Sequence, residues 1–143
     1  MAAQTFTVRI MDWSSARPLA APIRMRVFVE EQQVPAEIEL DDMDALSDHA
    51  ISFDSAGQGI GTGRLLPNGQ IGRMAVLGEW RGLGAGRLIL ETLMARARGR
   101  GMQSVTLHAQ LQAAPFYAKS GFIASGTTFM EAAIEHVEMH RTV

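Results

Sequence analysis

The stretch that decides the fold runs Met74-Ala75-Val76, then Arg81-Gly82-Leu83-Gly84-Ala85-Gly86-Arg87. Residues 74–76 belong to a mostly apolar run over residues 70–77, which we predict to be a β-strand. Apolar side chains recur at helical spacing after the glycines and predict an α-helix to about Arg98, with Ile89, Leu93 and Ala97 on one face. The segment therefore predicts a strand, a glycine-rich turn and a helix in direct succession.

A turn of this kind is typical of an anion site. The first N–H groups of a helix have no partner within the helix and carry the positive end of its dipole. Glycines let an anion approach the backbone because no Cβ is in the way, and Arg81 and Arg87 add positive charge. We therefore predict a phosphate-binding loop; the alternative is a flexible surface turn of the same composition.

Two other phosphate motifs fit less well. A P-loop ends in Gly-Lys-Ser or Gly-Lys-Thr, which this segment lacks. The dinucleotide fingerprint requires glycine where Arg87 stands, and it normally follows the first strand of a parallel sheet. Here about four predicted strands come before the glycines, so neither motif is favoured.

Composition limits the class of protein. The chain has 143 residues, of which 47% are apolar and 20% charged, so we expect a single domain over residues 1–143. The net charge of −2 gives no nucleic-acid signature. No apolar run approaches the ~20 residues of a membrane span, and no signal peptide is evident, so we expect a cytoplasmic protein. With no cysteine, disulfides, cysteine metal sites and an acyl-cysteine intermediate are excluded.

Charges are distributed unevenly along the chain. Nine acids and no Lys or Arg lie within residues 27–63, whereas seven arginines and only two acids lie within residues 64–100. One half can therefore attract a cation and the other an anion; the alternative is that these are ordinary solvated faces. On the first interpretation, the acids Glu37, Asp41, Asp42 and Asp44 lie in solvent and attract a cationic molecule.

The rest of the pattern predicts a mixed α+β chain. Strands are predicted over residues 5–11, 50–54, 59–66, 70–77, 104–109, 122–124 and 135–141. A helix is predicted to start after Asp12 or Ser14, to bury Leu19, Ile23 and Val27, and to end before Pro35. A short helix is predicted over residues 113–119.

Several segments resemble one family. Arg81-x-x-Gly84-x-Gly86 resembles the Q/R-x-x-G-x-G/A pyrophosphate signature of the GNAT superfamily of N-acyltransferases. The run Phe116-Tyr117-Ala118-Lys119-Ser120-Gly121-Phe122 resembles its F-Y-x-x-x-G-F segment. Residues 24–35, with Arg24, Val27-Phe28-Val29, Glu31-Gln32 and Val34-Pro35, resemble the small ElaA/YjcF-like branch. These pieces occur in the family's order.

The resemblance implies a mostly antiparallel sheet of about six to seven strands flanked by helices. Strands four and five splay apart in this fold, and acyl-CoA lies between them. The N–H of Val76 would face the thioester oxygen. Carried over residue by residue, the coenzyme A contacts would be Met74, Ala75, Val76, Arg81, Gly82, Leu83, Gly84, Ala85, Gly86, Arg87, Gln110, Phe116, Tyr117 and Lys119.

The implied reaction is direct transfer of an acetyl group from acetyl-CoA to a primary amine. Tyr117 is the only tyrosine and stands where the family often places its general acid; the alternative is that it only packs beside Phe116. A free phenol has a pKa of about 10 and a thiol about 8.5. Glu31 by resemblance, or His108 as the side chain best poised near neutrality, is the candidate base, and a water chain is the alternative.

The remaining expectations concern metals and partners. His136 and His140 would stand ~13 Å apart on a strand, too far to chelate a metal, so no metal is predicted. We expect a small amine acceptor, possibly cationic, and a homodimer that uses apolar surface from the last two strands. The rival classes are a non-catalytic acyl-CoA-binding module and an interaction protein that docks a basic partner on its acidic segment.

Overall fold

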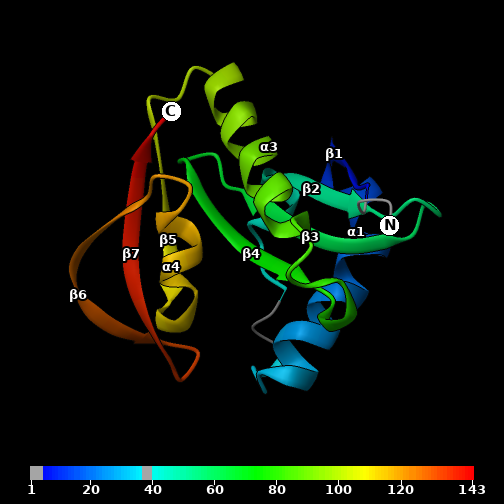
Figure 1. Ribbon diagram of the computed structural model, residues 1–143, viewed down its shortest axis with the longest axis horizontal. Helices are drawn as coiled ribbons and strands as arrows, with labels where there is room; N and C mark the ends of the chain where they lie inside the picture. The colour runs from blue at the N-terminus through cyan, green and yellow to red at the C-terminus, as the bar shows by residue number, and fades with distance from the viewer. Residues whose placement is uncertain (1–4, 37–39) are drawn as a thin grey trace.

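The computed structural model describes residues 5–36 and 40–143 and contains one seven-stranded sheet (Figure 1). The strand order is β1-β2-β3-β4-β5-β7-β6. Among the strands of the described residues, β4 and β5 are the only parallel pair, and the other five neighbouring pairs are antiparallel. The strands are β1 (Thr7–Met11), β2 (Asp48–Phe53), β3 (Gly59–Leu65), β4 (Gln70–Val76), β5 (Ser104–Gln110), β6 (Ile123–Glu131) and β7 (Ile134–Thr142). The predicted α+β fold with a mostly antiparallel sheet is confirmed.

The first helix begins where the sequence predicted. Asp12 caps α1 (Trp13–Arg24) by accepting a hydrogen bond from the Ser15 N–H over 2.9 Å. The chain continues as the π-helix η1 (Met25–Glu31) and leaves it before Pro35. Ile23 and Val27 are buried as predicted, whereas Leu19 is only partly buried. The C-terminal end of η1 lies beside the C-terminal end of β4, next to the cavities described below.

Helices lie on both faces of the sheet (Figure 1). Helix α3 (Ala85–Gly99) buries Ile89, Leu93 and Ala97 in a core shared with Leu107 and Ala109 of β5. Successive side chains of a strand point to opposite faces, so His108 and Gln110 face the other side of the sheet. That other face carries α1 and η1 next to β2, β3 and β4. The short helix α4 (Ala114–Ala118) follows β5 through η4 (Leu111–Ala113), and η2 (Asp44–Leu46) and η3 (Gly78–Trp80) complete the described elements.

The predicted splay of the fourth and fifth strands is present. Only Gln70 and Ile71 of β4 pair with β5, opposite Thr106 and Leu107. Directly beyond this pairing, β4 carries a bulge, because its register against β3 shifts and Arg73 adopts a left-handed φ of 50°. The bulge turns the rest of β4 away from β5 and opens the sheet.

The acidic and arginine-rich parts of the chain pair with each other. Asp44 is buried, 1% exposed, between Arg24 at 3.0 Å and Arg64 at 2.9 Å. Asp41 also binds Arg64, at 2.7 Å, and Asp48 accepts hydrogen bonds from Arg96 and Arg100. The expectation that these acids lie in solvent is therefore wrong for Asp44 and holds for Asp42, which is exposed. Glu37 lies outside the described residues.

The last two strands differ in their surfaces. Val137 and Met139 of β7 are buried in the core, β7 pairs with a neighbour on each side, and its fully exposed side chains are polar. β6 is an edge strand with Ile123 63% and Met130 66% exposed. The homodimer, with apolar surface from the last two strands as its expected contact, stays a prediction. No helix in residues 5–36 or 40–143 combines the length and apolar character needed to cross a membrane.

Candidate active site

Two neighbouring cavities lie at the splay. The larger, of about 790 Å³, lies between β4 and β5 and is called the cleft below. The smaller, of about 330 Å³, lies at the start of α3 and is called the loop pocket. Both are lined by Met74, Ala75, Val76, Arg81 and Tyr117, so the two cavities share a wall.

The loop pocket gathers most of the predicted coenzyme A contacts. Its lining is Met74, Ala75, Val76, Trp80, Arg81, Gly82, Gly84, Ala85, Gly86, Arg87, Phe116 and Tyr117. Of the other predicted contacts, Gln110 lines the cleft, and Leu83 and Lys119 line neither cavity. Trp80 also lines this pocket, and sequence reasoning missed it. Its position directly before Arg81 was a signal that could have identified it.

The loop has the geometry that an anion requires. Gly82 and Gly84 adopt left-handed φ angles of 76° and 96°, which favour glycine. A Cβ built on either would meet nothing within 4 Å, so the backbone there is open to approach. Gly84 is the N-cap of α3, whose first N–H groups have no partner within the helix. These residues fit the pyrophosphate of coenzyme A.

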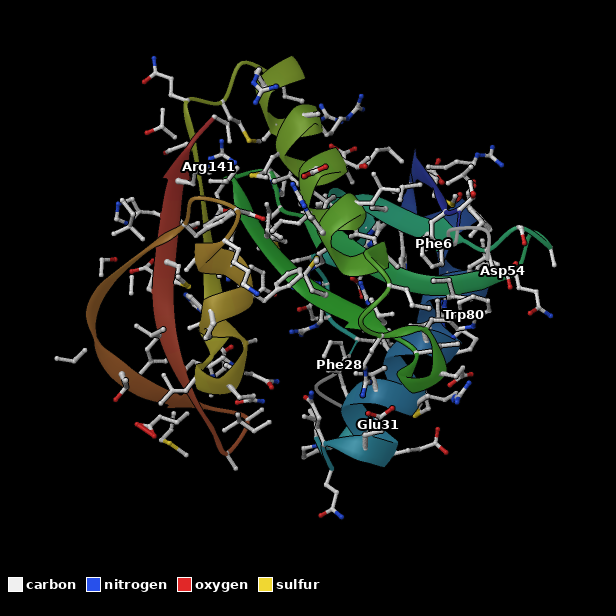
Figure 2. All side chains as sticks on the ribbon, viewed as in Figure 1. Phe6, Phe28, Glu31, Asp54, Trp80 and Arg141 are labelled. Atoms are coloured by element: carbon white, nitrogen blue, oxygen red, sulfur yellow. The ribbon has the colours of Figure 1, made fainter. Side chains whose placement is uncertain are left out.

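Arg81 is held by two protein groups. Its Nε donates to the Val76 carbonyl oxygen over 2.9 Å, and its Nη2 donates to Oε2 of Glu31 over 2.8 Å. Figure 2 shows Glu31 on η1, near the loop. Glu31 is absent from the residues that line the cleft, so the geometry favours a role beside Arg81 over contact with an acceptor amine.

The backbone of Val76 points into the splay. The next residue, Leu77, donates its N–H to the Ile60 carbonyl of β3 over 2.9 Å. Adjacent residues of a strand direct their N–H and C=O groups to opposite sides, so those of Val76 point away from β3. The N–H predicted to face a thioester oxygen therefore lies on the open side of β4.

Tyr117 lies where the two cavities meet. Its ring packs edge-on against Phe116 at 5.1 Å and Phe122 at 6.1 Å. Burial raises the pKa of the Tyr117 phenol to about 12, because the charged form loses solvation. The hydroxyl therefore stays protonated near neutral pH and can donate a hydrogen bond.

His108 lines the cleft from the opposite face of the sheet. Its Nδ1 lies 3.1 Å from Oε1 of Glu131, and its ring packs edge-on against Phe129 at 5.0 Å. Glu131 and the buried His136 also line the cleft. Sequence reasoning missed both as site residues, because their approach to His108 depends on the register of β5, β7 and β6.

Amide side chains connect the two walls of the cleft. Gln110 of β5 donates to Gln32, which follows η1, over 2.8 Å and accepts from Gln112 over 2.6 Å. Arg64 and Arg73, both bound to Asp41, are among the charged residues of the lining. No group of three His, Asp or Glu side chains suited to a metal ion occurs in the described part of the chain.

Comparison with known proteins gives a consistent result. The acetyltransferase (GNAT) domain family matches residues 18–143. The uncharacterized N-acetyltransferase YjcF of Bacillus subtilis is 37% identical over 121 residues, which cover 82% of this chain and 86% of that protein.

Solved structures agree in fold. An acyl-CoA N-acyltransferase from Pseudomonas aeruginosa matches with a TM-score of 0.83 and 26% identity, covering 96% of this chain and 99% of that one. Escherichia coli ElaA matches with a TM-score of 0.82 and 26% identity, covering 94% and 99%. The chain therefore belongs to the GNAT family of N-acetyltransferases and is of the ElaA/YjcF type.

Proposed function

We propose that this protein transfers an acetyl group from acetyl-CoA to a primary amine by direct transfer. The observation that carries the proposal is the position of Tyr117, which lines both the loop pocket and the cleft. The loop pocket has the backbone geometry for a pyrophosphate, and the cleft offers polar side chains for an acceptor. A thiolate that leaves acetyl-CoA would require a hydrogen-bond donor at the junction of the two cavities, where Tyr117 lies.

Two parts of the chain would bind different parts of acetyl-CoA. The loop from Arg81 to Arg87 would hold the pyrophosphate, and the open side of β4 at Val76 would hold the arm that follows it. Acetyl-CoA would supply an activated thioester. Since the chain has no cysteine, no acyl-cysteine intermediate forms. The amine nitrogen itself attacks the thioester carbon to give a tetrahedral intermediate, and collapse of this intermediate breaks the C–S bond.

Two protons must leave the acceptor. An ammonium group carries three N–H bonds and the amide product carries one. His108 faces the cleft and would take the first proton, which then passes to solvent. The second proton finally resides on the departing sulfur and reaches it through water.

The raised pKa of Tyr117 refines its role. A phenol with a pKa of about 12 is a weaker acid than a thiol, whose pKa is about 8.5, so full transfer of its proton to the thiolate is uphill. We infer that Tyr117 stabilises the leaving thiolate by donating a hydrogen bond. Tyr117 keeps its own proton, and the second proton of the acceptor reaches the sulfur through water.

The charges in the cleft do not favour a cationic, neutral or anionic acceptor. Asp41 and Asp44, which suggested a cationic acceptor, are bound to arginines. The cleft carries arginines and acids together, so its lining does not have a single sign of charge: Arg64, Arg73, Arg81, Asp41 and Glu131. Acceptor amines of all three charge types therefore belong in the panel.

The test is acetyl transfer by the purified chain. Acetyl-CoA would be mixed with polyamines, amino-acid amides, amino sugars and acidic amino acids, with free thiol and acetylated product both measured. Amine-dependent thiol release with matching product supports the proposal. Saturable acetyl-CoA binding without release for any amine would instead support a non-catalytic acyl-CoA-binding module.

A further inference from the structure

Glu131 reaches His108 across an intervening strand. Glu131 ends β6, His108 lies in β5, and β7 separates the two strands in the sheet. Glu131 Oε1 nevertheless lies 3.1 Å from Nδ1 of His108, within hydrogen-bond distance. The contact is therefore a specific arrangement and does not follow from strand pairing alone.

The contact determines which nitrogen of His108 can accept a proton. An ionised carboxylate only accepts hydrogen bonds, so Nδ1 of His108 must carry the hydrogen that it donates to Glu131. In the neutral ring, Nε2 then holds the free lone pair. His108 also lines the cleft, so this ring can serve an acceptor bound there.

Aromatic packing restrains the same ring. Phe129 of β6 packs edge-on against His108, with centroids 5.0 Å apart and planes at 80°. Phe129 also stacks on His136, with centroids 5.9 Å apart and planes at 23°. The Nδ1 of His136 binds the Ile134 carbonyl oxygen at 2.7 Å, which fixes that ring in turn.

The hairpin that presents Glu131 adopts a backbone that its sequence disfavours. Glu131 pairs with Ile134, and the two residues between them, Ala132 and Ala133, have φ angles of 51° and 62°. Two-residue turns with both φ angles positive normally contain Asn-Gly, because a Cβ is strained there. Such strain is often found at functional sites. Here it positions Glu131 and the Ile134 carbonyl together.

We infer that Glu131 is the positioning residue that holds His108 with Nε2 ready to accept the first proton of the acceptor ammonium. This inference rests on the proposed acetyl transfer. His108 is the residue that takes the proton, and Glu131 acts through it. The arrangement supplies from β5 and β6 a base that β4 does not provide, since β4 lines the cleft from Gln70 to Val76 without a carboxylate or a histidine.

A matched control lies directly opposite His108. Glu138 of β7 is the register partner of His108, so its side chain points to the same face. Glu138 is exposed, and none of the hydrogen bonds between described residues joins it to His108. The ionisable side chains beside His108 include Glu131 on β6, whose Oε2 also lies 3.7 Å from Nε2 of His136, and Glu138 on β7. Glu138→Ala removes a nearby charge and keeps the hydrogen bond.

The first readout is the tautomer of His108, measured by ¹⁵N NMR on histidine-labelled protein at a pH where the ring is neutral. We expect the Nδ1–H form in the wild type and in Glu138→Ala, and a shift toward the Nε2–H form in Glu131→Ala. The same tautomer in both variants would overturn the inference. This readout requires only folded protein, which the histidine spectrum itself confirms.

The second readout is kinetic, with the best acceptor of the amine panel. Glu131→Ala should lower kcat by about 10- to 100-fold, the scale for loss of a partner that orients a functional histidine. KM for acetyl-CoA should not change, and Glu138→Ala should match the wild type. Equal rates in the two variants would overturn the inference. A wild type that acetylates no amine would instead contradict the proposed function, and the tautomer measurement would still decide whether Glu131 orients His108.

Discussion

Arg81 and Glu31 form an ion pair in which Nη2 lies 2.8 Å from Oε2, so the arginine of the glycine-rich loop is shared between a carboxylate and the pocket. Both side chains are partly exposed, 47% and 40%. The carboxylate therefore lowers the positive potential at the loop by a modest, solvent-screened amount.

Glu31→Gln should consequently tighten coenzyme A binding by about two- to fivefold, the scale of an exposed ion pair, with kcat little changed. Calorimetric titration and steady-state rates would measure the two effects. Glu30→Gln, an exposed neighbour, is the control. A fall in kcat of about 10²-fold would instead identify Glu31 as the general base.

Gly84→Ala should remove most of the stabilisation that acetyl-CoA gives to the folded protein. Gly84 has φ of 96°, which costs an alanine about 1–2 kcal/mol, and its side chain would stand at the open backbone of the loop. Thermal melts with and without acetyl-CoA measure the shift in Tm. Gly99→Ala, at the far end of α3 and without a positive φ, should retain the full shift. An undiminished shift in Gly84→Ala would refute the loop assignment.

Tyr117→Phe should lower kcat by about 10²-fold, because the leaving thiolate loses its hydrogen-bond donor. Acetyl-CoA affinity should remain, since the ring still packs against Phe116 and Phe122. Stopped-flow or steady-state thiol release would measure the rate, and calorimetry the affinity. Near-normal turnover across the pH range would leave Tyr117 with a packing role only.

The same substitution should change stability at alkaline pH. The pKa of Tyr117 is raised to about 12 by burial, whereas the phenol of the unfolded chain ionises near pH 10. The unfolded state therefore loses its proton first, and stability falls between about pH 10 and 12. Urea unfolding curves of the wild type should show this decline, and Tyr117→Phe should show less of it.

Asp44→Asn should destabilise the fold by about 3–5 kcal/mol, because it removes the charge between two buried guanidinium groups, Arg24 and Arg64. Burial acts to raise the pKa of Asp44, but hydrogen bonds and charge from Arg24 and Arg64 outweigh it and lower the pKa below its ordinary value of 3.8. This stability is therefore present above about pH 4 and lost as the pH falls further.

Urea unfolding from neutral to acid pH would measure both effects, and Asp44→Asn should lose less stability on acidification than the wild type. Asp42→Asn, on an exposed neighbour, should change stability by less than about 0.5 kcal/mol. Equal stability of the two variants would contradict the network.

The glycine loop could be predicted from sequence because its chemistry is local. Gly82 and Gly84 mark left-handed backbone, and the N-terminus of α3 follows within two residues, so strand, turn and helix are encoded in one contiguous segment. The splay of β4 from β5 was available only through family resemblance. Its physical cause, the bulge at Arg73, has no signal in a single sequence, since arginine is not a residue that favours positive φ.

The charge pattern shows what a single sequence leaves undetermined. The acids at residues 41–48 and the arginines at residues 64–100 form separate blocks in the sequence, which suggested two surfaces of opposite sign. In the fold, Asp48 meets Arg100 and Asp44 meets Arg64, because β2 pairs with β3 and packs against α3. The register of the strands and the packing of α3 decide which charges pair, and neither can be predicted from composition. For the same reason Glu131 was missed as the partner of His108.

The opening between β4 and β5 passes from one face of the sheet to the other. Tyr117 belongs to the face that carries α3 and α4, whereas His108 belongs to the face that carries α1 and η1. On the proposed function, the acceptor would therefore reach the thioester carbon from the face opposite the one that holds Tyr117, and neither ligand would obstruct the route of the other. Two-substrate kinetics should accordingly give intersecting double-reciprocal plots. A single compound that joins both ligands would have to pass through the opening between β4 and β5.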